Sequence, residues 1–460
     1  MNVVVVIADA LRRDHLYDGQ IDAHWMPRTA ARLSDWYQFQ DCSAGAPWTL
    51  PACTSILTGR GSDVHRHFSH EHQLTQPTLV EHFGSERHSA AFVNNSALAK
   101  SSGLFDGFDH HELIRPLDDV FDAAHRFLDE RREDGAPYFL LLHSNLVHDY
   151  YLSSTRRHYE WSFPDRDDWF ELGSRVLSGN GLSATEQETV RNMYRSCCSA
   201  LDEELDRFFA RLNTAETAIG FVADHGEGFD YAGARIHHGG RLHNDVLGVP
   251  LAISVPPTVS ARAHAAMRQA TSSMMSATDL LPTLLSLSGH SVPDDIEGRC
   301  LDQDVTARPR STLVAEDRRY LYLASRQRLN TNPKGKNMSR RIRLQNRLRR
   351  STVAQDFSVR CMLNDQHKLI VTEFDGRSAL LQRVAGPLLR RSHNGDPVVV
   401  LDGRRWCGFE LFDRTADTEE RVNLLHAGTP DERLLMELAD LGPHADRSSQ
   451  LADLVAHHTT

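Results

Sequence analysis

Five short segments of the chain carry apolar residues with almost no polar alternation. They are rich in β-branched and aromatic residues, and each has the length of a strand. A pattern of this kind is typical of strands that are buried on both faces. The predicted strands are 2–9, 89–95, 136–145, 218–224 and 249–255.

Amphipathic segments lie between these strands and predict helices. The clearest are 116–133 and 183–212, and the second opens with Ser183 and Glu186 at the spacing of a capping box. Alternating strands and helices predict an α/β fold with a central, mostly parallel sheet that helices flank on both sides. In such a sheet, ligands bind outside the carboxyl ends of the strands.

Composition narrows the class of protein. A chain of 460 residues with 40% hydrophobic and 25% charged residues is expected to be soluble, with one large domain and an appendage or with two domains. No apolar run reaches the length of a membrane span, and the short N-terminal apolar run lacks the positive flank and cleavage site of a signal peptide. Seven cysteines, two of them adjacent, form neither a disulfide framework nor a CxxC metal pattern, so we expect a cytoplasmic protein.

Charged and polar residues follow the predicted strands. The first strand ends at Asp9, and the fourth ends at Asp224 with His225 directly after it. Two carboxylates and an imidazole at neighbouring strand ends form a ligand set for a divalent cation. For either aspartate alone, a helix cap or a salt bridge is the simpler interpretation. Three further polar residues lie at the end of the third strand: His143, His148 and Asp149.

The segment APWTLPACTSILTGR, residues 46–60, places Thr49 at the start of a run that is predicted to be helical and to end at Gly59. A helix N-terminus favours an anion through its unpaired N–H groups and its dipole. That position suits a nucleophile that attacks a phosphate or a sulfate. The alternative is that Thr49 is an N-cap with Pro51 in the first turn.

Taken in order, these segments resemble the alkaline phosphatase and sulfatase superfamily, especially its sulfatase-like hydrolases. The motifs are VVVVIADALRRDHL, TLPACTSILTGR, FLLLHSNLVHDYY, VADHGEGF, HGGRLHNDVLGVPL and ATDLLPTLLSLSG. The similarity extends from residue 1 to about 300 and returns at 365–370 and 410–425, which look like the closing segment of those enzymes. The resemblance implies an alkaline phosphatase-like α/β fold with a small C-terminal α+β subdomain.

The resemblance also implies roles for individual residues. Asp149 and Asn95 are nearby polar candidates with a weaker correspondence. The histidines either protonate the leaving oxygen or ligate a second cation. The implied catalytic residues are Thr49, His148 and His238, and the implied metal ligands are Asp9, Thr49, Asp224 and His225. Among divalent metals, carboxylate and imidazole ligands favour zinc, with manganese or calcium as alternatives.

The chain departs from the sulfatase pattern at the nucleophile. Sulfatases of this kind oxidise a Cys or Ser to formylglycine, with an Arg four residues on, whereas this chain has Thr49 and Cys53. Threonine cannot become formylglycine, and we interpret Cys53 as a small buried residue. The sequence therefore favours the threonine-using branch: a metal-dependent hydrolase or transferase of a phosphate or phosphonate ester that forms a covalent Thr49 intermediate. The alternatives are a sulfuric ester hydrolase without formylglycine and a non-catalytic binding protein.

A strongly basic segment, 326–350, holds ten Lys or Arg residues and no acid, against a net charge of -11 for the chain. It is either a solvated loop or a lid that attracts an anionic ester substrate, nucleic acid or an anionic surface. The oligomeric state is open. The predicted organisation is a catalytic domain at 1–325, a basic linker or lid at 326–350, a C-terminal subdomain at 351–425, and a peripheral helix and tail at 426–460.

Overall fold

The computed structural model divides the chain into two units. The first comprises Met1–Asp165, Ser183–Gly228 and Asp245–Pro309, and the second comprises Arg166–Leu182, Phe229–Asn244 and Arg310–Thr460. The predicted basic segment 326–350 and the tail 426–460 lie outside the described residues. The structure describes residues 1–16, 25–69, 74–84, 87–99, 102–115, 119–151, 182–230, 235–305, 313–317, 357–375, 398–401 and 405–425.

The first unit is built on a seven-stranded sheet with the order β2-β10-β7-β1-β6-β4-β5. The strands from β7 to β5 run parallel, and β10 pairs antiparallel with both β7 and β2. The strands are β1 (Asn2–Ala8), β2 (Tyr37–Gln38), β4 (His88–Val93), β5 (His110–Leu113), β6 (Tyr138–Ser144), β7 (Thr217–Ala223) and β10 (Leu251–Ser254). A short parallel pair, β3 (Cys42–Ser43) and β11 (Met275–Ser276), stands apart from this sheet. The predicted α/β class with a mostly parallel sheet is confirmed.

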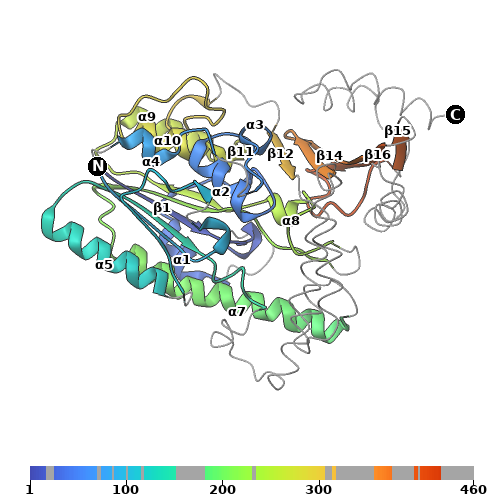
Figure 1. Ribbon diagram of the computed structural model, residues 1–460, viewed down its shortest axis with the longest axis horizontal. Helices are drawn as coiled ribbons and strands as arrows, with labels where there is room; N and C mark the ends of the chain where they lie inside the picture. Colours follow the sequence, from blue (N-terminus) through green and yellow to red (C-terminus); the bar gives the residue numbers. More distant parts are fainter. Residues whose placement is uncertain are drawn as a thin grey trace. The chain divides into compact units, whose positions relative to one another are not determined.

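Helices cover both faces of this sheet (Figure 1). One layer contains α1 (Pro27–Leu33), α5 (Asp119–Asp134) and α7 (Ala184–Phe209), and α7 packs on both α1 and α5. The opposite layer contains α2 (Thr49–Thr58), α4 (Leu79–Phe83), α9 (Ala261–Ala270) and α10 (Leu280–Leu287). The short remaining elements are α3 (Ser62–His65), α8 (Asn244–Leu247), η1 (Arg13–His15), η4 (Ser96–Leu98) and η7 (Ala277–Asp279).

The central strand β1 explains where polar residues gather. Its residues from Val3 to Ala8 are buried, as the near absence of polar alternation predicts. It pairs with β6 on one side and β7 on the other, and Ala8 lies beside both Ser144 and Ala223 in these registers. The residues that follow the three strands therefore emerge together at one edge of the sheet.

Helix α2 begins at Thr49 and ends where Gly59 adopts a left-handed conformation with φ 67°. Its N-cap residue is Trp48, whose side chain makes no capping hydrogen bond. The interpretation of Thr49 as an N-cap is therefore wrong, because Thr49 is already in the helix and its hydroxyl has another partner. The capping box predicted at Ser183 and Glu186 is present at the start of α7.

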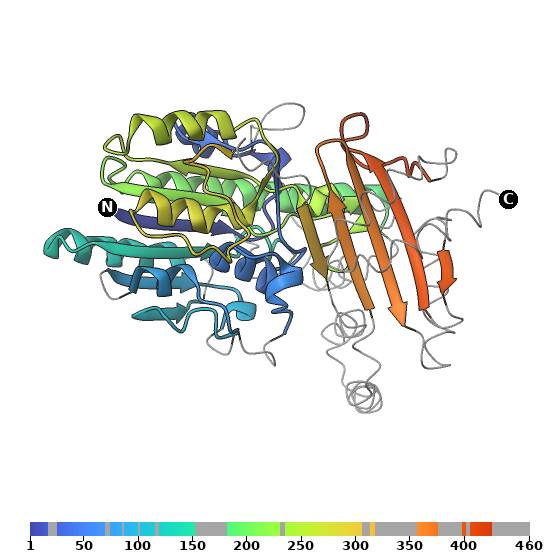
Figure 2. The same ribbon diagram turned by 90° about the horizontal axis from the view of Figure 1, so that it is seen from above.

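The second unit contains a five-stranded antiparallel sheet with the order β12-β13-β14-β16-β15 (Figure 2). The first of these strands lies before position 325, where the sequence predicts the end of the catalytic domain. A short antiparallel pair, β8 (Phe229–Asp230) and β9 (Arg235–Ile236), also belongs to this unit. The sheet strands are β12 (Leu313–Asp317), β13 (Phe357–Leu363), β14 (His367–Asp375), β15 (Val398–Leu401) and β16 (Arg405–Asp413).

A buried ion pair links a strand of the second unit to the segment after β16. Lys368 Nζ on β14 lies 2.7 Å from Glu420 Oε1, and both side chains are 2% exposed. Glu420 Oε2 also accepts a hydrogen bond from the backbone N–H of Asn244, which secures the segment after β9.

As for membranes, none of the helices in the described parts of the chain has the length and apolar character needed to span a bilayer.

Candidate functional site

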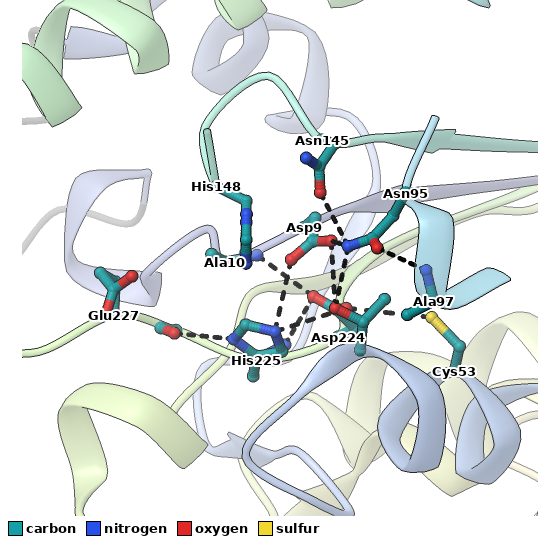
Figure 3. A network of polar contacts seen from close by, with 12 residues as sticks. Asp9, Ala10, Cys53, Asn95, Ala97, Asn145, His148, Asp224, His225 and Glu227 are labelled. Atoms are coloured by element: carbon teal, nitrogen blue, oxygen red, sulfur yellow. Dashed lines mark hydrogen bonds and ion pairs between the residues drawn. The ribbon is translucent and has the colours of Figure 1, made fainter. Parts of the chain in front are cut away.

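Three side chains at the carboxyl edge of the first sheet form a compact group of ligand atoms. Asp9 follows β1, and Asp224 and His225 follow β7. All three are fully buried, and one ligand atom from each lies within 4.8 Å of the others. His225 Nε2 is 3.3 Å from Asp9 Oδ1 and 3.7 Å from Asp224 Oδ2 (Figure 3). The structure thus brings together the two carboxylates and the imidazole that the sequence predicts as metal ligands.

The backbone around these residues fixes their orientation. Asp224 Oδ1 accepts hydrogen bonds from the backbone N–H groups of Ala10, at 3.2 Å, and His225, at 2.8 Å. Ala10 adopts φ 60°, a left-handed conformation that non-glycine residues rarely occupy. Such strain is typical of functional sites, where surrounding contacts hold it in place. Here it aims the Ala10 N–H at Asp224 directly after the strand that delivers Asp9.

His225 is oriented by its other ring nitrogen. Its Nδ1 lies 2.9 Å from the carbonyl oxygen of Gly226, and because a carbonyl only accepts, Nδ1 carries the hydrogen. In the neutral ring the Nε2 lone pair then faces the two carboxylates, as in a typical metal-binding histidine. Gly226 has no room for a side chain, because a Cβ would lie 2.3 Å from the backbone oxygen of Asp245.

Thr49 lies beside the first carboxylate. Its hydroxyl donates to Asp9 Oδ2 at 3.2 Å, so the first residue of α2 touches the residue that ends β1. Asn95, the N-cap of η4, extends Nδ2 to Asp9 Oδ2 at 2.6 Å and to Thr49 Oγ1 at 3.1 Å. The same amide nitrogen lies 2.9 Å from Asn145 Oδ1, which fixes the amide orientation (Figure 3). Asn95, which the resemblance suggests only weakly, is therefore the residue that orients the Thr49 hydroxyl.

His148 also reaches this site. Its Nδ1 lies 2.9 Å from Asp149 Oδ1, and Arg115 contacts the other oxygen of that carboxylate at 3.4 Å. Figure 3 shows the His148 ring close to Asp9 and His225, and its centroid is 6.2 Å from that of His225. The structure therefore places His148 near the predicted metal ligands, and the contact of its Nδ1 with Asp149 fixes its ring.

Mutual charges set the protonation of the cluster. Burial alone raises the pKa of Asp9, but the positive charges of His148 and His225 outweigh it and hold that pKa well below its usual range. Burial lowers the pKa of His148, yet the charge of Asp9 and the hydrogen bond to Asp149 raise it to about 10. The pKa of His225 is also raised, because the charges of Asp224 and Asp9 outweigh burial. The carboxylates of Asp9 and Asp224 therefore favour positive charge on His148 and His225.

Two residues at the site have no role in the sequence-based prediction. His143, on β6, is fully buried, and its Nε2 lies 3.5 Å from Asp9 Oδ2. Cys53, one helical turn after Thr49, is buried as predicted, and its Sγ lies 3.9 Å from Asp224 Oδ2. Burial and the charges of Asp224 and Asp9 raise the pKa of the Cys53 thiol well above its usual value. The sequence places His143 near the end of a predicted strand, but its contact with Asp9 depends on the lateral order of the strands.

The donor set fits a divalent cation. Asp9 Oδ1 is buried and accepts no hydrogen bond within the described part of the chain, so one carboxylate oxygen is available as a ligand. Two carboxylates and an imidazole are suitable ligands for zinc or manganese. Thr49 Oγ1 is adjacent through its contact with Asp9. The residues present therefore suit the metal that the sequence predicts, without fixing its identity.

His238 belongs to the second unit, in the segment after β9. The preceding residue, His237, adopts a left-handed φ of 61°. Farther along, His243 Nε2 lies 3.1 Å from Glu410 Oε1 on β16, so the sheet of the second unit holds this segment. The prediction that His238 acts with Thr49 remains a prediction.

Comparison with known proteins identifies the family. The sequence matches the family model named Sulfatase over residues 1–290. A search of curated proteins finds no match. Among solved structures, the phosphonate monoester hydrolase of Agrobacterium radiobacter is 16% identical, with a TM-score of 0.59, over 99% of this chain and 96% of that one.

Two further solved structures are similar over nearly the whole chain. A 2-O GAG sulfatase is 16% identical with a TM-score of 0.61, over 99% of this chain and 92% of that one. A protein in complex with its substrate D-glucosamine-2-N,6-O-disulfate is 14% identical with a TM-score of 0.61, over 98% of each chain. At this level of identity, the likeness is one of fold. Because the family model covers more than half of the sequence, the chain belongs to the sulfatase family of enzymes.

Proposed function

We propose that this protein is a metal-dependent hydrolase or transferase of phosphate or phosphonate esters, with Thr49 as its nucleophile. The observation that supports this most strongly is the contact of Thr49 Oγ1 with Asp9 Oδ2, at 3.2 Å, beside the buried ligand group of Asp224 and His225. Thr49 also begins α2, whose first turn contains no acidic residue. The dipole of that helix favours an anionic group at this position.

The reaction has two displacements. Thr49 Oγ1 attacks phosphorus, the bond from phosphorus to the ester oxygen breaks, and a phospho-threonine forms. Attack of water, or of an acceptor alcohol, then breaks the bond between phosphorus and Thr49 Oγ1 and restores the hydroxyl. A divalent cation held by Asp9, Asp224 and His225 would lower the pKa of the Thr49 hydroxyl and offset charge on a non-bridging oxygen.

The chain's own residues would prepare each displacement. Asp9 Oδ2 accepts a hydrogen bond from the Thr49 hydroxyl, and Asn95 Nδ2 donates a hydrogen bond to Thr49 Oγ1 and so orients it. Because Nδ1 of His148 is engaged with Asp149, its Nε2 is the atom that would give a proton to the leaving oxygen. His238 is proposed to bind the transferred group or to serve as a second proton donor.

The identity of the nucleophile favours phosphorus over sulfur. A formylglycine hydrate carries two oxygens on one carbon, so it can expel a bound sulfate by reforming the aldehyde. The Thr49 carbon carries one oxygen, so a group bound to it leaves only by a second displacement at its central atom. Attack on phosphorus is a well-established route for such a step in metal-assisted sites. The phosphonate monoester hydrolase among the similar structures is consistent with this substrate class.

Turnover of three chromogenic esters tests the proposal. Wild type, Thr49→Ala and Thr49→Ser are assayed with bis(p-nitrophenyl) phosphate, p-nitrophenyl phosphate and p-nitrophenyl sulfate after loading with zinc, manganese or calcium. We expect wild type to cleave a phosphate ester and Thr49→Ala to lose activity on the order of 10⁴-fold or more. Thr49→Ser retains a hydroxyl and should keep part of the activity.

The matched control is Thr58→Ala at the other end of α2. The Thr58 hydroxyl donates to the backbone oxygen of Thr54, so its loss perturbs the same helix without touching the site. Turnover of the sulfate ester alone, no turnover of any ester by the metal-loaded protein, or full activity of Thr49→Ala would contradict the proposal.

A further inference from the structure

A second group of possible ligand atoms adjoins the first and has Asp224 in common with it. We propose that Cys53, His143 and Asp224 form a second, softer metal position that shares Asp224 with the first one. The three come from α2, β6 and the end of β7, and one ligand atom from each lies within 4.8 Å of the others. Figure 3 shows the sulfur of Cys53 on the side of Asp224 away from His148.

The distances are equal to or slightly longer than the edges of a coordination tetrahedron. Cys53 Sγ and His143 Nε2 each lie 3.9 Å from Asp224 Oδ2, and His143 Nε2 lies 3.5 Å from Asp9 Oδ2. Bonds of about 2.0–2.3 Å to zinc place neighbouring ligand atoms roughly 3.2–3.7 Å apart. The nitrogen-to-oxygen separations are too long for good hydrogen bonds, and small side-chain movements would bring them to coordination geometry.

The environment of His143 gives an independent reason. Its side chain is fully buried, and neither ring nitrogen has a hydrogen-bond partner within the described part of the chain. A buried polar group without a partner is costly, and native structures rarely retain one without a function. A metal ion bonded to Nε2 would satisfy the nitrogen that faces Asp9 and Asp224.

The negative charge of Asp9 and Asp224 also favours a bound cation. Within the described residues, neither Asp9 nor Asp224 is paired with a Lys or an Arg, although both are fully buried. Buried carboxylates need compensating positive charge, which the nearby imidazoles of His148 and His225 supply in part and to which a metal ion would add. A thiolate and an imidazole are soft and borderline ligands, so this position would select zinc over calcium.

A metal at this position would be structural. All three ligands are fully buried, so the position is closed to a substrate. It would attach α2 to the end of β7 one helical turn below Thr49, and so fix the helix that presents the hydroxyl. Binding converts the Cys53 thiol to a thiolate and releases its proton to solvent. The inference rests on the proposed first metal position only through the shared Asp224.

Cobalt substitution tests this second position. The metal-free protein is loaded with Co²⁺, and the near-ultraviolet charge-transfer absorption that only a thiolate–cobalt bond gives is recorded, together with the metal content by mass spectrometry. We expect wild type to show this absorption and to bind two ions, whereas Cys53→Ser loses the absorption and binds one. His143→Gln should weaken the absorption, and Cys361→Ser, which alters another buried cysteine on β13, should retain it.

The wild-type spectrum decides the question even if a variant does not fold. One bound cobalt ion with no thiolate absorption would overturn the second position, and ester turnover by that same protein would leave the proposed function intact. Thiolate absorption that persists in Cys53→Ser would also overturn it. A third outcome separates the two proposals. If wild type shows the thiolate absorption but cleaves no ester, and Cys53→Ser loses the absorption, the second position is supported and the proposed function is contradicted.

Discussion

Mild acid should destabilise the segment that holds α2. His65 ends α3 and is buried, with Nε2 3.0 Å from Ser55 Oγ on α2. Its Nδ1 accepts the backbone N–H of His67 at 3.0 Å, so Nδ1 carries no hydrogen and the ring is neutral. Burial lowers the pKa of His65 to about 3, and the charge of His67 adds to this effect. Protonation would place a hydrogen on Nδ1 and break the hydrogen bond from the His67 backbone N–H, in the loop that His65 Nε2 holds against the helix bearing Thr49.

The size and sign of the effect follow from the two pKa values. The unfolded chain takes up a proton near 6.5, whereas folded His65 stays neutral until about pH 3. Below pH 6.5 the unfolded state therefore binds more protons, and the free energy of unfolding falls as the pH falls. The contribution is fully present above pH 6.5. At about pH 5 it has decreased by about 2 kcal/mol, because one pKa unit corresponds to about 1.36 kcal/mol.

Urea unfolding of wild type and His65→Gln at about pH 7.5 and about pH 5 measures this contribution. Wild type should lose about 2 kcal/mol more than His65→Gln over this interval, whatever the stability of the variant at the higher pH. His88→Gln removes an exposed histidine from β4 and controls for the loss of one imidazole. Equal losses in wild type and His65→Gln would refute the reasoning.

Three further changes have defined outcomes. Lys368→Met removes the cation 2.7 Å from buried Glu420, so urea unfolding should show a loss of about 3–5 kcal/mol, and an unchanged midpoint would contradict the buried pair. Gly226→Ala places a Cβ 2.3 Å from the Asp245 oxygen, so the loop must move with His225, and metal analysis should show reduced metal binding. Asn95→Ala removes the hydrogen bonds to Asp9 and the Thr49 hydroxyl, so kcat/KM for the ester cleaved should fall about 10–100-fold; an unchanged value would exclude a positioning role.

The sequence predicts the main elements of the site because they depend on local patterns. Uninterrupted apolar runs mark β1 and β7, so Asp9 and the pair Asp224 and His225 can be placed at strand ends. The helical run that ends at Gly59 places Thr49 at the start of α2. Parallel strands then bring their carboxyl ends to one edge, as the register of β1 with β7 confirms.

Contacts that depend on lateral strand order could not be predicted in the same way. The order along the chain does not reveal that β1 lies between β6 and β7, and this placement brings His143 of β6 next to Asp9 and Asp224. The hydrogen bonds of Asn95 to Asp9 and Thr49 likewise depend on where the turn after β4 meets α2. Tertiary packing, and not propensity, decides such contacts.

The central claim is that Thr49 carries the transferred group. The most direct test is rapid acid quenching of the metal-loaded protein during turnover of a phosphate ester, followed by peptide mass spectrometry. The account predicts a peptide that contains Thr49 and has gained the mass of one phosphoryl group, which fragmentation locates on the threonine. The same peptide from protein quenched without substrate should lack this added mass. Turnover at an undiminished rate by Thr49→Ala, or a phosphoryl group found on another residue, would contradict it.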